Sequence, residues 1–148
     1  MQSKDHYFIP PNQSIDDIPT DILHLYICLY EQHRDERLIL STNLFHQLKS
    51  ISIGYKCFNN VCEVVLDGLE SLESVKIGGK CFAIGDYEER NDGICRITNC
   101  PNLRQLEIGD YSFEDFKLFE LSNVNSIQSI KLGNACFKYA EEFSLKGE

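Results

Sequence analysis

The sequence lacks long apolar runs and is poor in positive charge. No window approaches the ~18 consecutive apolar residues of a membrane helix, and the start, Met-Gln-Ser-Lys-Asp-His, lacks the apolar core of a secretory signal. The chain has 14 basic residues against 23 acidic ones, a net charge of -9 that repels polyphosphate unless a basic face is segregated. We therefore expect a cytoplasmic protein that binds neither membrane nor nucleic acid.

Motifs of enzymatic chemistry are also missing. The chain has no Gly-x-Ser-x-Gly, no P-loop and no dinucleotide fingerprint. Its four histidines, at 6, 24, 33 and 46, have no cysteine or carboxylate at diagnostic spacing, and the acidic residues gather in stretches such as 86–89. Nothing nominates a catalytic residue, so we expect a protein that is not an enzyme and uses no cofactor.

What is present is an internal repeat. Four segments share the pattern apolar-x-x-apolar-x-apolar-Gly-x-x-Cys-Phe, with Ser in place of Cys in the third, and they begin at Leu48, Leu72, Leu103 and Ile127. The steps between them are 24, 31 and 24 residues. A fixed period of about 20 to 30 residues is typical of a solenoid, in which each unit stacks on its neighbours.

A second, looser element lies between these segments. Its versions are Val64-Val-Leu66, Cys95-Arg-Ile97, Phe119-Glu-Leu121 and Phe143-Ser-Leu145. Alternation with period 2 in both elements predicts two short strands in each unit, one on each side of a flattened coil. We expect the Gly after the first strand to permit a sharp turn, because glycine tolerates backbone conformations that other residues avoid.

The pattern Leu-x-x-Leu-x-Leu-x-x-x-x-Phe resembles the core of the leucine-rich-repeat superfamily, and the Cys-Phe is similar to a class common in microbial and protist proteins. The resemblance implies a β-rich leucine-rich-repeat solenoid, an α/β-type horseshoe with little helix and about five repeats. At the ninth position, where the family usually has a buried Asn, stand Lys56, Lys80, Tyr111 and Ala135. We therefore expect other groups to satisfy the loop carbonyls.

The N-terminal part allows two interpretations. Ile22-Leu-His-Leu25-Tyr-Ile27 fits the repeat frame, 26 residues before Leu48, and favours a solenoid over 22–148, with repeats starting near 22, 48, 72, 103 and 127 and a cap over 1–21 that shields the open end. Alternatively, Thr20 or Asp21 caps a helix that runs through Tyr30. That segment also resembles the opening of an F-box, which would make the protein a substrate receptor of a ubiquitin ligase.

The seven cysteines suggest zinc at first, because Cys57 and Cys62, and likewise Cys95 and Cys100, are five residues apart. In the repeat alignment, however, Cys95 shares its position with Val64 and Phe119, which marks a core position. We expect reduced, metal-free, mostly buried thiols.

The repeat also predicts the core and its open end. The predicted core residues are Leu48, Ile51, Ile53, Phe58, Leu66, Leu72, Val75, Ile77, Phe82, Ile97, Leu103, Leu106, Ile108, Phe113, Leu121, Ile127, Ile130, Leu132 and Phe137. The sequence stops within a repeat, so the strand 143–145 is left uncovered. We expect either that the chain is a fragment of a longer one or that a partner covers this end.

The residues between the apolar ones point to the concave face in leucine-rich repeats, and this resemblance implies a non-enzymatic scaffold that binds another protein there. The displayed positions carry four cations against two carboxylates, so we expect a partner with an acidic patch. The candidate contact residues are Tyr26, Lys49, Lys76, Arg104, Glu107 and Lys131. Besides the ubiquitin-ligase receptor, a fragment of a surface adhesin is the other alternative.

Overall fold

The computed structural model describes residues 6–8, 17–27, 37–41, 45–58, 61–82 and 93–146, and they are nearly all parallel strand with almost no helix. The strands are β1 (His6–Phe8), β2 (His24–Ile27), β3 (Arg37–Ser41), β4 (Ser50–Ile53), β5 (Glu63–Asp67), β6 (Ser74–Ile77), β7 (Gly93–Thr98), β8 (Gln105–Ile108), β9 (Phe116–Ser122), β10 (Ser129–Leu132) and β11 (Glu142–Lys146). No helix within the described residues is long and apolar enough to cross a membrane.

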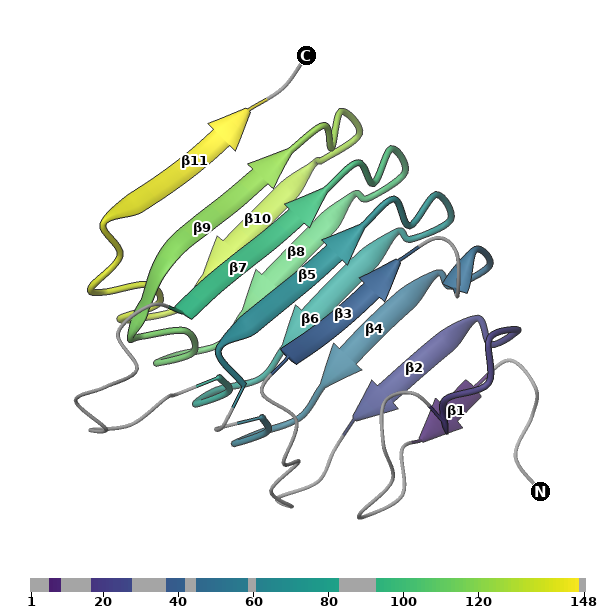
Figure 1. The fold of residues 1–148 in the computed structure, drawn as a ribbon, viewed down its shortest axis with the longest axis horizontal. Helices are drawn as coiled ribbons and strands as arrows, with labels where there is room; N and C mark the ends of the chain where they lie inside the picture. Colours follow the sequence, from purple (N-terminus) through teal and green to yellow (C-terminus); the bar gives the residue numbers. More distant parts are fainter. Residues whose placement is uncertain are drawn as a thin grey trace.

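The strands form two open sheets. One has six strands in the order β1-β2-β4-β6-β8-β10, and the other has five in the order β11-β9-β7-β5-β3. From β2 onward, consecutive strands alternate between the sheets, so each strand of one sheet lies in the connection between two parallel neighbours of the other. Figure 1 shows the two layers, with β1 and β11 at opposite ends.

The register of the six-stranded sheet follows the sequence pattern. Ile51 pairs with Val75, 24 residues later; Val75 pairs with Leu106, 31 residues later; and Leu106 pairs with Ile130, after a further 24. These offsets equal the steps at which the apolar pattern recurs. The segment expected to hold the extra seven residues, 85–93, lies outside the described residues except for Gly93.

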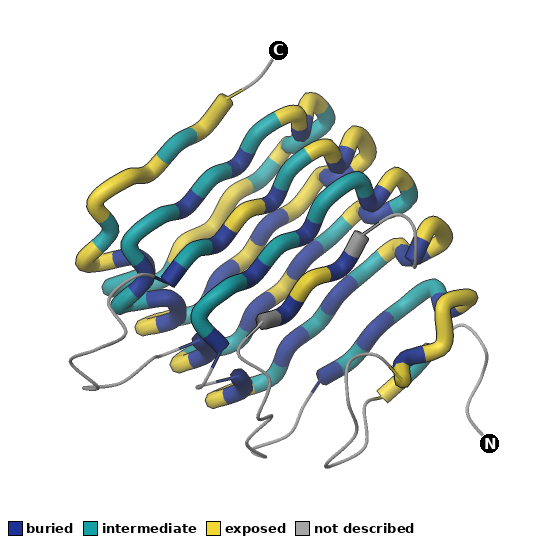
Figure 2. Tube along the Cα trace, viewed as in Figure 1, coloured by how far each residue is buried: buried dark blue, intermediate teal, exposed yellow. Residues whose placement is uncertain are grey.

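Side chains of alternating strand residues point into the space between the sheets (Figure 2). The predicted core residues are buried there with three exceptions. Ile130 and Leu132 are each 39% exposed, and Ile127 is only partly buried. The prediction was wrong for Ile130 and Leu132 because β10 is the last strand of its sheet, and no further strand covers its inward side chains.

Four phenylalanines stack through the core, one from each repeat. The ring centroids of Phe58, Phe82, Phe113 and Phe137 lie 5.3, 4.6 and 4.9 Å apart in succession. All four have left-handed backbones, with φ between 54 and 61°. Such a conformation costs about 1 kcal/mol or more for a non-glycine residue, and burial of the whole ring offsets that cost.

The repeated glycines do not serve the turn as the sequence suggested. A Cβ on Gly78 would lie 2.8 Å from the carbonyl oxygen of Gly54, and one on Gly109 would lie 2.6 Å from the nitrogen of Gly79. These glycines are therefore required by the close approach of neighbouring backbones. The left-handed turn residue comes two positions later, at Lys56, Lys80, Tyr111 and Ala135, with φ of 59, 56, 63 and 60°.

A ladder of thiols and one hydroxyl takes the place of the asparagine ladder. Cys81 Sγ donates to the carbonyl of Gly54 at 2.7 Å, Ser112 Oγ to that of Gly78 at 2.7 Å, and Cys136 Sγ to that of Gly109 at 3.0 Å. The expected burial of the thiols is confirmed for Cys57, Cys81, Cys95 and Cys100, whereas Cys62 and Cys136 are partly buried. Within the described residues, none of the six cysteines forms a disulfide.

At the N-terminal end, residues 24–27 form strand β2, so the alternative helix is wrong over these residues. β2 alternates buried and half-buried positions, as expected for a strand with one face in the core. β1 pairs with β2 in parallel and ends the six-stranded sheet, and Ile18 and Ile22 are buried beside it. Residues 28–30 of the predicted helix lie outside the described residues.

Candidate functional site

The outer face of the six-stranded sheet presents a continuous row of side chains, one from each strand. We call it the outer row; its members are Phe8, Tyr26, Ser52, Lys76, Glu107 and Lys131, each in register with the next. Their neighbours in each strand are buried, because alternate residues of a strand point to opposite faces. The structure thus brings four of the six predicted contact residues, Tyr26, Lys76, Glu107 and Lys131, into one line.

The other two predicted contact residues lie in a second row, just before the strands begin. Lys49 and Arg104 are exposed there with Glu73 between them, since the Glu73 nitrogen donates to the Lys49 carbonyl at 2.7 Å and the Arg104 nitrogen to the Glu73 carbonyl at 2.8 Å. Both rows therefore alternate cation, carboxylate, cation. In each row the single carboxylate stands between two cations.

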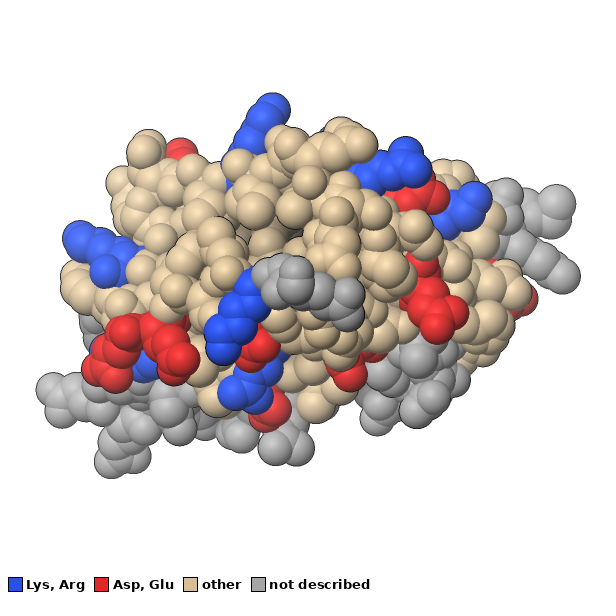
Figure 3. Space-filling model, turned by 90° about the horizontal axis from the view of Figure 1, so that it is seen from above, with Lys and Arg blue, Asp and Glu red and all other residues tan. Residues whose placement is uncertain are grey.

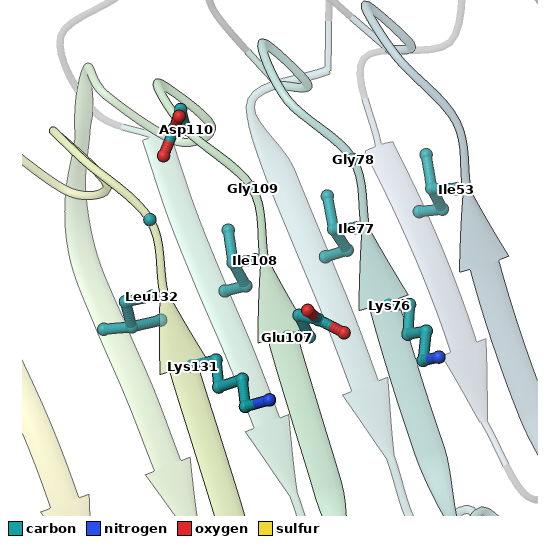
Figure 4. Close-up of a pocket in the computed structure, with 11 residues that line it drawn as sticks. Ile53, Lys76, Ile77, Gly78, Glu107, Ile108, Gly109, Asp110, Lys131 and Leu132 are labelled. Atoms are coloured by element: carbon teal, nitrogen blue, oxygen red, sulfur yellow. The ribbon is translucent and has the colours of Figure 1, made fainter.

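A groove of about 500 Å³ lies beside the C-terminal half of the outer row. Figure 4 shows Glu107 between Lys76 and Lys131, with Asp110 at the far end. Its floor includes Gly78, Gly109 and Gly133, whose missing side chains leave the space open. The glycines required by backbone stacking thus also shape the groove.

The charged side chains of the groove are not held in ion pairs. Among the described residues, ion pairs join Arg96 to Glu120 at 3.3 Å and Lys117 to Glu141 at 3.9 Å, both at the other sheet, and none joins Glu107 to Lys76 or Lys131. Elsewhere charges of both signs are interspersed over the side of the molecule seen in Figure 3. The groove charges are therefore available to a ligand without breaking an internal pair.

The N-terminal end of the outer row is aromatic, and the sequence did not reveal it. The rings of Phe8 and Tyr26 stack with centroids 4.7 Å apart, the rings of His6 and His24 stack at 4.8 Å, and His6 Nδ1 lies 3.3 Å from the Tyr26 hydroxyl. Tyr26 is consequently half-buried rather than freely displayed. β1 has only three residues, too few for alternation to be recognised; the aromatic pair Tyr7-Phe8 was the one available signal.

The described thiols are poorly suited to chemistry. Burial raises the pKa of the Cys100 thiol to about 11, and it raises the pKa of Cys95 and Cys136 as well. The thiolate is the form that attacks electrophiles and binds metals, so these cysteines are protonated and unreactive at neutral pH. Within the described residues, no three His, Cys, Asp or Glu side chains are placed to hold a metal ion.

Comparison of the chain with known proteins found no match to a family model, to a curated protein or to a solved structure.

Proposed function

We propose that the chain is a leucine-rich-repeat solenoid of about five repeats that serves as a non-enzymatic scaffold for another protein. The equality between sequence steps and strand offsets supports the solenoid, because each repeat then adds one strand to each sheet. The left-handed residues and buried phenylalanines recur at the same place in each unit. This recurrence is what stacking of equivalent units produces.

The partner binds on the outer row and the adjoining groove. The observation that carries this proposal is the line of exposed, unpaired Lys76, Glu107 and Lys131 beside a groove of about 500 Å³. Lys49 and Arg104 add two more cations on the same face. Local positive charge on a chain of net charge -9 favours a partner with an acidic patch, because the field steers opposite charges together.

The thiols support a cytoplasmic location for this scaffold. The six described cysteines occur outside disulfides, and most are buried in the core. Reduced thiols are typical of proteins in reducing compartments. The same observation disfavours the adhesin alternative, since exported proteins meet oxidising conditions.

The test compares two variants with equal changes in charge. Changing Lys76, Arg104 and Lys131 together to glutamate reverses the cations of the binding face, whereas changing Lys56, Lys80 and Lys138 to glutamate reverses three exposed cations at the turns. Wild type and both variants are immobilised and used to capture proteins from an extract of the source organism. The proposal requires a protein retained by the wild type and the turn variant and lost by the face variant.

The captured protein is then purified and its association rate measured at low and high salt. We expect the face variant to associate about tenfold more slowly at low salt, and the difference to shrink as salt screens the charges. Circular dichroism of each variant confirms folding. Equal association of a folded face variant and the wild type would remove this face as the binding site.

A further inference from the structure

Strand β11 is an open edge whose core-facing side chains are exposed. It pairs with β9 on one side and has no strand on the other. Phe143 is 46% exposed and Leu145 is 58% exposed, although their ladder partners Phe119 and Leu121 are buried. Figure 2 shows exposure along nearly the whole of β11.

The direction of each β11 side chain follows from its neighbours. The Phe143 ring lies 4.8 Å from that of Phe119, so Phe143 points into the core, and Leu145 points the same way because strand residues alternate. Glu142, Ser144 and Lys146 therefore lie on the outer face. β10 ends the other sheet at the same end of the molecule, and its inward Ile130 and Leu132 are exposed as well.

The sequence of β11 is complementary to itself when reversed. In an antiparallel pair of two copies centred on Ser144, Glu142 of one copy stands opposite Lys146 of the other, and this happens twice. On the inner face, Phe143 stands opposite Leu145, also twice. Opposite charges and apolar pairs directly across an antiparallel ladder each stabilise it, so this register satisfies every side chain of the strand at once.

β11 also lacks the usual protection of an edge strand. Natural edges carry proline, a bulge or an inward-pointing charge that prevents pairing with another chain. β11 has no proline and no inward charge, and its ladder with β9 runs without a bulge. Its two charged residues are placed where they complement a second copy.

We propose that two copies of this chain associate through β11, which pairs antiparallel with β11 of the second copy around Ser144. The two five-stranded sheets then form one continuous sheet across a two-fold axis. An interface of this kind is closed, because the same strand is used by both copies. Ile130 and Leu132 lie on the side that the second copy approaches, and they gain cover from it.

The test exchanges the two charges of β11. Glu142→Lys alone places Lys opposite Lys, and Lys146→Glu alone places Glu opposite Glu. We expect each single variant to raise the dimer dissociation constant about tenfold. The double variant, with both changes, restores opposite charges and returns the constant to near the wild-type value. Sedimentation velocity over a range of protein concentrations measures all four proteins.

Mixing provides the sharper measurement. One copy with Glu142→Lys and one with Lys146→Glu place opposite charges at both contacts, so an equimolar mixture associates although neither variant does so well alone. The controls are Glu70→Lys and Lys80→Glu, two exposed residues at the turns on either side of β6. We expect these controls to dimerise like the wild type, separately and mixed.

A Ser144→Cys variant tests the register independently. Residues directly opposite across antiparallel strands have Cβ atoms about 4.5–5.5 Å apart, close enough for a disulfide after a small shift. Mild oxidation should link two copies of this variant and leave the wild type unlinked. A wild type that stays monomeric at high concentration, or charge variants that dimerise as it does, would overturn the proposal.

Discussion

Ser112 is the one hydroxyl in a ladder otherwise made of thiols. It is fully buried, donates to the Gly78 carbonyl at 2.7 Å and accepts from the Cys81 nitrogen at 3.0 Å. Two backbone groups of neighbouring units thus depend on one side chain. The stronger hydroxyl bonds make this the point in the ladder where the cost of removal is easiest to measure.

Ser112→Ala is expected to lower the free energy of unfolding by about 1–3 kcal/mol, because it leaves a buried carbonyl and a buried N–H without their partner. Ser112→Cys, which installs the residue found in the other three repeats, should cost less. Urea denaturation of both variants and the wild type gives the comparison. Equal stability of the alanine variant would mean that the ladder bonds contribute nothing.

Cys100 predicts how stability depends on pH. Its burial raises the thiol pKa from 9.0 to about 11, so the folded state favours the protonated form. The resulting stabilisation is complete below pH 9 and is lost as the pH rises to about 11, and it amounts to about 2–3 kcal/mol. Stability should therefore fall over this range.

The control for this prediction is Cys100→Val, because Val124 occupies the equivalent position in the next unit. Lysines and tyrosines also titrate in this range, but they are common to both proteins. The difference in unfolding free energy between wild type and Cys100→Val should shrink or change sign between pH 9 and pH 11. A constant difference would show that the thiol does not titrate between the two states.

At the scale of the structural element, the glycine corner tests backbone stacking. Gly109→Ala brings a Cβ to 2.6 Å from the Gly79 nitrogen, and backbone there has no room to move. A loss of about 1–3 kcal/mol or more is expected. Gly79→Ala is the matched control, since its Cβ would lie 3.4 Å from the Tyr55 ring and the Asp110 carbonyl.

Thermal or urea unfolding should separate these two alanine variants clearly. Gly79→Ala is expected to stay within about 1 kcal/mol of the wild type, because the contact is ordinary and the unfolded chain loses freedom. Similar losses in both would indicate that the corners are sensitive to any side chain, whatever the distance.

The long repeat allows a second test at this scale. β6 and β8 pair without a shift although 31 residues separate equivalent positions instead of 24. Deleting the seven residues 85–91 makes this step equal to its neighbours. We expect the melting temperature to stay nearly unchanged, because closure entropy varies slowly with length. A large destabilisation would mean that the deleted residues contribute to the packed body.

At the scale of the whole molecule, stability comes from one elongated core between two sheets. Far-ultraviolet circular dichroism should show strand signal well above helix signal, since the described residues are nearly all strand. A spectrum dominated by helix would contradict the architecture. The two ends of this core differ, because β1 covers part of one end while β10 and β11 leave apolar side chains exposed at the other.

Local pattern was enough to predict much of this fold. The alternation of Ile51 and Ile53, or of Val75 and Ile77, determines which side of a strand is apolar, because the strand period is a property of the backbone itself. The recurring steps likewise predicted which residues share a row, so Lys76, Glu107 and Lys131 could be named together from the sequence.

Other features depend on contacts between distant segments, which a single-sequence pattern does not contain. The need for glycine at position 109 arises from the backbone of residues 78 and 79, and the exposure of Ile130 and Leu132 arises from the absence of a further strand in the sheet. The groove beside Glu107 exists because three glycines from different strands lie side by side. Sequence periodicity determined the direction of each side chain, whereas only the stacking of neighbouring units decided how much room and cover each one has.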